Sequence, residues 1–251
     1  MWFINPRPKS LAGAVLMAAL VVSLAMLTAG RGGALHASPA PSPQDVFSLR
    51  GVGTSQKALA LTFDISWGSV MPPKVLAILE RDHVPATFFL SGPWADSHPE
   101  YVRQLVRDGM QVESHGWAHV NYSSLSYAGV LENISRTGAV LAKLTGQPAT
   151  FIRPPNGDFT RSAIRAAHAL GYTVVTWGTD SLDWMNPGVS VIIHRVVRRA
   201  HPGDIVLLHA SDTCKQTDLA LPTIITDLNR QGYRLVTLAT LLKMGSPQYV
   251  G

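Results

Sequence analysis

Residues 57–65 read KALALTFDI, and this stretch decides the fold. Its apolar and β-branched side chains lack the strict alternation of a half-exposed strand, so we predict a strand that is buried on both faces, as in a parallel sheet. The run ends on a carboxylate, Asp64, which is followed by Ile65. A carboxylate at the end of a buried strand is either paired inside the fold or part of a functional site.

The same kind of apolar run recurs along the chain and alternates with stretches of helical spacing. Further strands are predicted at 86–90, 111–114, 150–153, 172–178, 204–209 and 234–238, and helices at 72–82, 99–107, 127–144, 161–170, 189–200 and 219–230. Such alternation is typical of a parallel sheet in an α/β protein. About seven strands in this length favour a distorted (β/α) barrel over a doubly wound sheet, and no G-x-G-x-x-G motif follows a strand.

The N-terminal part differs in composition from the rest. Arg7 and Lys9 precede an apolar run at residues 11–29, which is long enough to cross a bilayer as a transmembrane helix. We therefore predict a signal or membrane anchor at 1–30, a flexible linker rich in Gly, Ala, Pro and Ser at 31–45, and one domain at 46–245. The positive charges before the run place the domain outside the cytoplasm, either membrane-anchored or secreted after cleavage.

The overall composition, with 46% hydrophobic and 15% charged residues, is that of a folded protein. The formal charge of +5 is spread along the chain and no nucleic-acid-binding motif is present, so we expect a bacterial wall or a phospholipid surface as partner and no nucleic acid. The single cysteine, Cys214, cannot form an intramolecular disulfide. The chain is expected to be a monomer.

Two histidines, His115 and His119, stand four residues apart directly after a predicted strand. Two neutral imidazoles at this spacing can share one metal ion. Arg153 precedes two prolines that stiffen the backbone, which suits a bidentate pair with a carboxylate.

Asp183 and His209 follow two other predicted strands. A carboxylate that orients an imidazole is a common arrangement for proton donation. Because a (β/α) barrel gathers its catalytic groups from the ends of several strands, we expect these residues and Asp64 around one site.

Five stretches, TFDISWG, SHGWAHVN, RPPNGDF, DSLDW and LLHAS, resemble in this order the five motifs of the polysaccharide deacetylase family. This family is the NodB-homology domain of carbohydrate esterase family 4, and the resemblance covers residues 55–245. The variant spellings are similar to its sporulation-associated branch, which carries an N-terminal membrane segment. The resemblance implies a distorted (β/α) barrel that hydrolyses the N-acetyl group of amino sugars in peptidoglycan or a similar N-acetylated glycan, in the cell wall or spore cortex.

The resemblance also implies a role for each motif residue. Asp64 is similar to the catalytic base and Arg153 to the residue that pairs with it. Asp183 is similar to the carboxylate that orients the catalytic acid, and His209 to that acid.

His115 and His119 resemble the family's two metal-binding histidines. The backbone N–H of Asn156 occupies the place that helps to hold the oxyanion. Trp117 and Trp184 lie inside motifs, where aromatic faces can stack on sugar rings.

Two positions depart from the family's pattern. The family completes its metal site with a second Asp directly after the base, where this chain has Ile65, and a Ser or Thr usually stands at the position of Gly116. We therefore expect a divalent metal, zinc or cobalt, to be weakly bound or absent. Two alternatives stay open: a non-catalytic wall-glycan-binding or structural protein on a deacetylase scaffold, and a hydrolase of a different acyl bond such as an O-acetyl ester.

Overall fold

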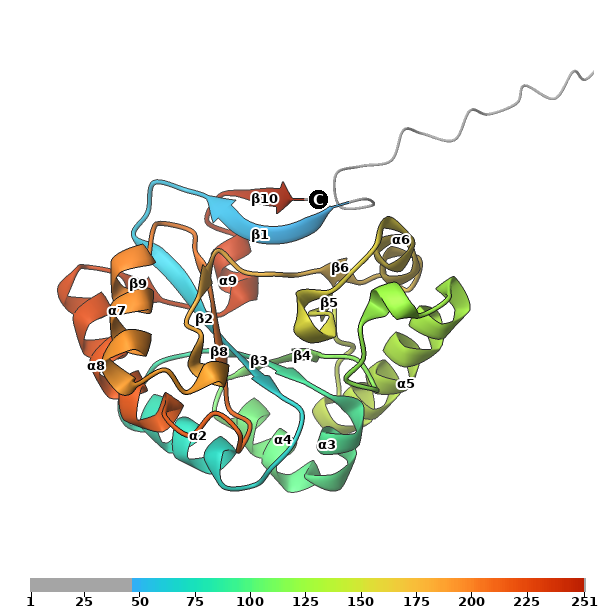
Figure 1. Ribbon diagram of the computed structural model, residues 1–251, viewed down its shortest axis with the longest axis horizontal. Helices are drawn as coiled ribbons and strands as arrows, with labels where there is room; N and C mark the ends of the chain where they lie inside the picture. Colours follow the sequence, from blue (N-terminus) through green and yellow to red (C-terminus); the bar gives the residue numbers. More distant parts are fainter. Residues whose placement is uncertain (1–46, 251) are drawn as a thin grey trace, which may run out of the picture. The chain divides into compact units, whose positions relative to one another are not determined.

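The structure is a computed structural model that describes residues 47–250 (Figure 1). Its centre is a parallel sheet that curls into an incomplete barrel, with the strand order β6-β5-β4-β3-β2-β8-β7 and with β9 beside β2. The strands are β2 (Ala58–Ile65), β3 (Thr87–Leu90), β4 (Gln111–Ser114), β5 (Phe151–Ile152), β6 (Thr173–Val174), β7 (Thr179–Asp180), β8 (Ile205–His209) and β9 (Arg234–Leu235). The distorted (β/α) barrel expected from the sequence is confirmed.

Helices cover the outside of this sheet (Figure 1). They are α2 (Met71–Arg81), α3 (Gly92–Ser97), α4 (Pro99–Arg107), α5 (Tyr127–Thr145), α6 (Arg161–Ala169), α7 (Val189–Arg199), α8 (Thr217–Arg230) and α9 (Leu238–Leu242), with short 3₁₀ helices η2 (Tyr122–Ser124), η3 (Pro155–Gly157) and η4 (Asp183–Met185). Local sequence sets their ends. The Ser126 side chain accepts a hydrogen bond from Gly129 N at the start of α5, and Gly146 adopts a left-handed conformation at its end.

Most predicted helices and strands are present with small shifts at their ends, but the strands predicted at 172–178 and 234–238 are reduced to the two-residue β6 and β9. The elements α3, α9, β7 and the two strands at the ends of the described residues were not predicted. Within residues 47–250, no helix is both long and apolar enough to cross a membrane. The predicted anchor at 1–30 and linker at 31–45 lie outside the described residues.

The two faces of β2 pack against different parts of the core. Phe63 and Ile65 belong to the large apolar cluster beneath the surrounding helices, whereas Ala58 and Ala60 belong to a smaller cluster inside the barrel. Successive side chains of a strand point to opposite faces, so Asp64 shares the inner face with the alanines. β2 therefore directs Asp64 into the barrel and Ile65 toward the helices.

β1 (Ser48–Gly53) pairs with β10 (Ser246–Val250) in an antiparallel ribbon next to the barrel (Figure 1). Leu49 bridges to Val175, directly after β6, and Gly51 bridges to Asp204, directly before β8. β1 thus spans the open side of the curled sheet. Because β10 pairs with β1, the described fold runs past the predicted domain end at residue 245.

Candidate active site

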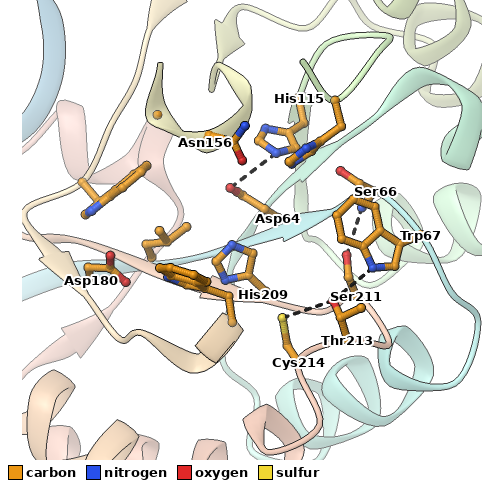
Figure 2. Close-up of a pocket in the computed structure, with 15 residues that line it drawn as sticks. Asp64, Ser66, Trp67, His115, Asn156, Asp180, His209, Ser211, Thr213 and Cys214 are labelled. Atoms are coloured by element: carbon orange, nitrogen blue, oxygen red, sulfur yellow. Dashed lines mark hydrogen bonds and ion pairs between the residues drawn. The ribbon is translucent and has the colours of Figure 1, made fainter. Parts of the chain in front are cut away.

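A cavity of about 430 Å³ opens at the C-terminal ends of the strands, within the usual size range of small-molecule sites (Figure 2). Six of the nine predicted site residues line it, namely Asp64, His115, His119, Asn156, Trp184 and His209. Arg153 and Asp183 are fully buried directly behind this wall. Trp117 is the one predicted site residue that neither lines the cavity nor hydrogen-bonds through its side chain to a residue that does.

Asp64 and Arg153 form a buried ion pair at the base of the cavity. Arg153 Nη1 donates to Asp64 Oδ1 at 2.8 Å, and Arg153 Nη2 donates to the carbonyl of Thr176 at 3.3 Å. The Arg153 guanidinium also lies 4.2 Å from the ring centre of Phe89. Burial alone raises the pKa of Asp64, but the charge of Arg153, with smaller contributions from His115 and His209, brings this pKa below its ordinary value. Asp64 is therefore a carboxylate at neutral pH.

His115 is held with one lone pair directed into the site. Its Nδ1–H donates to the carbonyl of Arg153 at 2.7 Å, so in the neutral imidazole the lone pair lies on Nε2, which faces Asp64 Oδ2 at 3.7 Å. Burial lowers the pKa of His115 to about 4, so the ring is neutral at pH 7. The His119 ring lies 5.4 Å from the His115 ring, and Trp67 packs edge-on against His119 at 5.1 Å.

The loop that carries both histidines is braced from α5. Asn133 Oδ1 accepts from Trp117 N at 2.7 Å and from the Tyr122 hydroxyl at 2.9 Å. Gly116 has a φ of +77°, and a Cβ there would come within 2.5 Å of Asn133 Oδ1 and of the Tyr122 hydroxyl oxygen. Asn133 thus supplies the brace that the family's Ser or Thr would give, and it leaves no room for a side chain at Gly116.

His209 and Asp183 form a second pair, and His209 lies at the end of β8 directly beside Asp64 on β2. Asp183 Oδ1 accepts from His209 Nδ1 at 2.7 Å, while Asp183 Oδ2 accepts from His209 N at 2.8 Å and from Thr217 Oγ1 at 2.7 Å. Burial by itself lowers the pKa of His209, but the charge and hydrogen bond of Asp183 raise it above the ordinary value. His209 therefore directs Nε2 into the cavity and retains its proton at higher pH than a free imidazole.

The donors at His115 and Asp64 fit a divalent cation as a pair. His115 Nε2 carries a free lone pair 3.7 Å from Asp64 Oδ2, and two ligands of one tetrahedral zinc ion lie about 3.4 Å apart. The His119 ring lies beside His115, but its nitrogens and these two atoms do not all lie within 4.8 Å of one another. Ile65 is buried among apolar side chains and supplies no ligand.

Elsewhere in the described residues, a potential ligand cluster consists of Asp183, His209 and Cys214. Its donors are already engaged, because both Asp183 oxygens accept hydrogen bonds and His209 Nδ1 donates to one of them. Burial raises the pKa of the Cys214 thiol to about 12, so it carries its proton at neutral pH. Asp183 therefore orients His209, and Cys214 lies next to this pair; the three residues do not form a metal site.

Asn156 and the two tryptophans of the motifs have different surroundings. Asn156 lies at the cavity edge with a φ of +59°, and its side-chain amide donates to Asn121 Oδ1 at 2.7 Å. Trp184 lies at the mouth and is 52% exposed, so a ligand can reach its ring. Trp117 instead packs under the Arg136 guanidinium at 3.8 Å, away from the cavity lining.

Other residues at the site were not singled out from the sequence. Trp177, Asp180 and Leu207 line the cavity, and Thr217 buttresses Asp183. Asp180 lies in the quoted DSLDW motif, three residues before the orienting carboxylate, so its position at a strand end was a usable signal. Thr217 and Asn133 lie on helices and carry no comparable signal.

A barrel whose strand ends present a buried base, an oriented imidazole and a pair of neutral histidines defines a hydrolase site of the acid–base type with a place for a metal ion. Comparison with known proteins agrees. Residues 51–175 match the model of the polysaccharide deacetylase family. A peptidoglycan-N-acetylglucosamine deacetylase of Bacillus cereus is 37% identical over 196 residues, which cover 76% of this chain and 91% of the relative. The chain belongs to the polysaccharide deacetylase family.

Two other relatives bear on the variant metal site. The peptidoglycan-N-acetylmuramic acid deacetylase PdaA of Bacillus subtilis is 28% identical, over 75% of this chain and 73% of the relative. A crystallised Bacillus anthracis protein, described as a pseudoenzyme of carbohydrate esterase family 4, is 31% identical with a TM-score of 0.72, over 77% of this chain and 68% of that one. A mutant of that protein has restored enzymatic activity. The deacetylases of this family are metal-dependent.

Proposed function

We propose that this protein is a polysaccharide deacetylase that hydrolyses the acetamide of N-acetylated amino sugars in peptidoglycan. One observation carries the proposal: Asp64, which is paired with Arg153, and His209, which is paired with Asp183, lie on neighbouring strands and line the same cavity (Figure 2). A base and an acid with separately adjusted pKa values are what amide hydrolysis requires. Peptidoglycan as the substrate is supported by the names of the similar relatives.

In this mechanism Asp64 acts as the base. Its Oδ1 is held by Arg153 and its Oδ2 is directed toward the histidines, where a water molecule can lose its proton to the carboxylate. The water oxygen forms a bond to the acetamide carbon. We assign the backbone N–H of Asn156, a residue at the cavity edge, as the donor to the carbonyl oxygen as negative charge develops there.

His209 acts as the acid. Asp183 holds Nδ1, so Nε2 is the atom that delivers a proton to the amide nitrogen as the carbon–nitrogen bond breaks. The products are acetate and the free amino sugar. Asp183 is buried and accepts three hydrogen bonds, so it keeps the imidazole in one orientation.

We propose zinc or cobalt as the metal, held weakly by His115 and His119 with Asp64 as the nearest carboxylate. When bound, such an ion polarises the acetamide carbonyl and lowers the pKa of water. Loss of the family's second Asp at Ile65 reduces the affinity expected for this ion.

A second candidate function is a glycan-binding protein without turnover. Ile65 at the position of a metal ligand favours it, as does the similarity to a pseudoenzyme of the same family. Both candidate functions predict glycan binding, but only the deacetylase predicts acetate release.

We further propose that the domain works outside the cytoplasm, tethered to the membrane. The support is the apolar run at residues 11–29 with Arg7 and Lys9 before it. The variant motif spellings support a place in the wall chemistry of spore formation.

The test is acetate release by the full chain from N-acetylglucosamine oligomers and from purified peptidoglycan, with chelator, zinc or cobalt added in turn. We expect release that falls with chelator and recovers with added metal. Glycan binding without release from a folded protein under every condition would favour the non-catalytic candidate.

A further inference from the structure

Asp180, at the end of β7, places a carboxylate in the cavity wall that the proposed mechanism does not use. Its Oδ1 accepts from Leu182 N at 2.8 Å. Its Oδ2 makes no hydrogen bond with any residue in the described range 47–250. Asp180 lies on the opposite side of His209 from Ser211 and Thr213 (Figure 2). This oxygen is therefore open to a ligand.

Among the described residues Asp180 forms no direct ion pair, although its charge interacts with that of the buried Arg153. Asp64 is paired with Arg153 at 2.8 Å, and Asp183 with His209 at 2.7 Å. No such pair within 4.0 Å involves Asp180 in the part of the chain that the structure describes. Arg195 Nε donates to its backbone carbonyl at 3.1 Å, and Arg195 does not line the cavity. Asp180 thus gives this side of the cavity a net negative charge.

Three indoles line the cavity with Asp180, those of Trp67, Trp177 and Trp184. Trp177 packs directly on Gly157, where a Cβ would come within 2.6 Å of the indole. Trp67 and Trp184 are exposed. The flat faces of indoles accommodate sugar rings, and a carboxylate accepts charge-assisted hydrogen bonds from hydroxyl groups. A free carboxylate oxygen in the same cavity as these indoles has the chemistry that recognises a neutral sugar.

We propose that Asp180 is a specificity-determining residue that accepts a hydrogen bond from a sugar hydroxyl and selects neutral over acidic N-acetylated amino sugars. Peptidoglycan alternates N-acetylglucosamine, which is neutral, with N-acetylmuramic acid, which carries a lactyl carboxylate. An acidic sugar whose carboxylate lies next to Asp180 meets a like charge that no direct ion pair within residues 47–250 neutralises, whereas a neutral sugar gains the hydrogen bond. This inference rests on the proposed function and names N-acetylglucosamine units as its substrate.

The local backbone determines which substitution is informative. Leu182 has a φ of +58°, and Asp180 Oδ1 stabilises that turn through the Leu182 N–H. Asp180→Ala would remove this bond and disturb the loop before Asp183. Asp180→Asn keeps an oxygen for the Leu182 N–H and the size of the side chain, and it removes only the charge. The matched control is Asp227→Asn, which removes one charge from an exposed pair with Arg230 on α8.

The experiment offers the full-length protein a peptide-free glycan strand in which both sugars are present. Mass spectrometry of fragments then shows which sugar has lost its acetyl group. We expect wild type to favour N-acetylglucosamine and Asp180→Asn to reduce that preference by about tenfold. The variant should deacetylate the neutral sugar more slowly and the acidic sugar faster than wild type does. Asp227→Asn should keep the wild-type preference, and higher salt should weaken the preference of wild type and of Asp227→Asn but not that of Asp180→Asn.

An unchanged preference in Asp180→Asn, or an equal loss on both sugars, would overturn the role of Asp180 while the deacetylase function stands. The opposite case, in which Asp180 selects the sugar but no hydrolysis takes place, is identified by calorimetric measurement of the binding of N-acetylglucosamine and N-acetylmuramic acid oligomers. Selective binding that depends on Asp180, without acetate release, would support Asp180 and contradict the proposed function. A folded wild type that neither binds nor hydrolyses either sugar would overturn both.

Discussion

The two sides of the cavity differ in how firmly the protein holds their side chains in place. On one side, Asp183 is fully buried and accepts three hydrogen bonds, two of them from His209 and one from Thr217. On the other, His115 is fixed by one hydrogen bond to a backbone carbonyl, and His119 is exposed with ring contacts to His115 and Trp67. The acid side is held rigidly by the protein, whereas the histidine side depends more on what it binds.

This difference indicates which side of the cavity retains the groups that catalysis requires. A buried polar group destabilises the fold unless each of its hydrogen-bond partners is present. Asp183, His209 and Thr217 supply one another with these partners. The histidine side has one apolar residue, Ile65, at the position of a ligand. We therefore expect activity to be most sensitive to the acid side and least sensitive to position 65.

The largest effect is expected from His209→Ala. Removal of the proton donor should reduce kcat for acetate release by about 10²–10⁴-fold. It also leaves Oδ1 of the buried Asp183 without its partner, so the melting temperature should fall and kcat is compared at a temperature where the variant is folded. His194→Ala on the exposed surface of α7 is the matched control and should keep wild-type activity. Wild-type kcat in His209→Ala would show that the acid lies elsewhere.

A smaller and more diagnostic effect is expected from Asp183→Asn. Asp183 raises the pKa of His209 despite the burial of the ring. The protonated imidazole therefore stabilises the fold at pH values below the ordinary pKa of histidine, and this stabilisation is lost as the pH rises through the raised pKa of His209. The variant should lose activity and its alkaline limb of kcat/KM should move to lower pH. The acidic limb, set by the lowered pKa of Asp64, should stay in place. An alkaline limb at the wild-type pH would mean that another group sets it.

Much of the fold and of the acid–base site could be predicted from the sequence for one physical reason. Parallel strands that are buried on both faces leave continuous apolar runs, as at 57–65, and their C-terminal ends meet at one edge of the sheet. Asp64, His115 and His209 follow such runs directly, and the structure brings them to one cavity.

The rest of the site depends on loops, where no periodicity indicates which way a side chain points. Trp117 lies two residues after His115 in the same motif, yet its ring packs under Arg136 instead of lining the cavity. The bracing role of Asn133 depends on a contact between a helix and a loop that are distant in sequence. Strands as short as β7 give too few residues for a pattern, which is why β7 was not predicted.

The smallest effect on function is expected from Ile65→Asp, which tests the histidine side directly. Ile65 lies on the outer face of β2 in the apolar core, so the new carboxylate would be buried without a partner and should lower the free energy of unfolding by about 3 kcal/mol or more. Zinc affinity, measured by calorimetry on the full chain, should stay within about threefold of wild type, because the strand alternation directs position 65 away from the histidines. Ile65→Asn, which carries no charge, is the control for burial of a polar group. A rise in zinc affinity of about tenfold or more in Ile65→Asp alone would show that the end of β2 turns to deliver a third ligand to His115 and His119, and that the two sides of the cavity differ by this one residue.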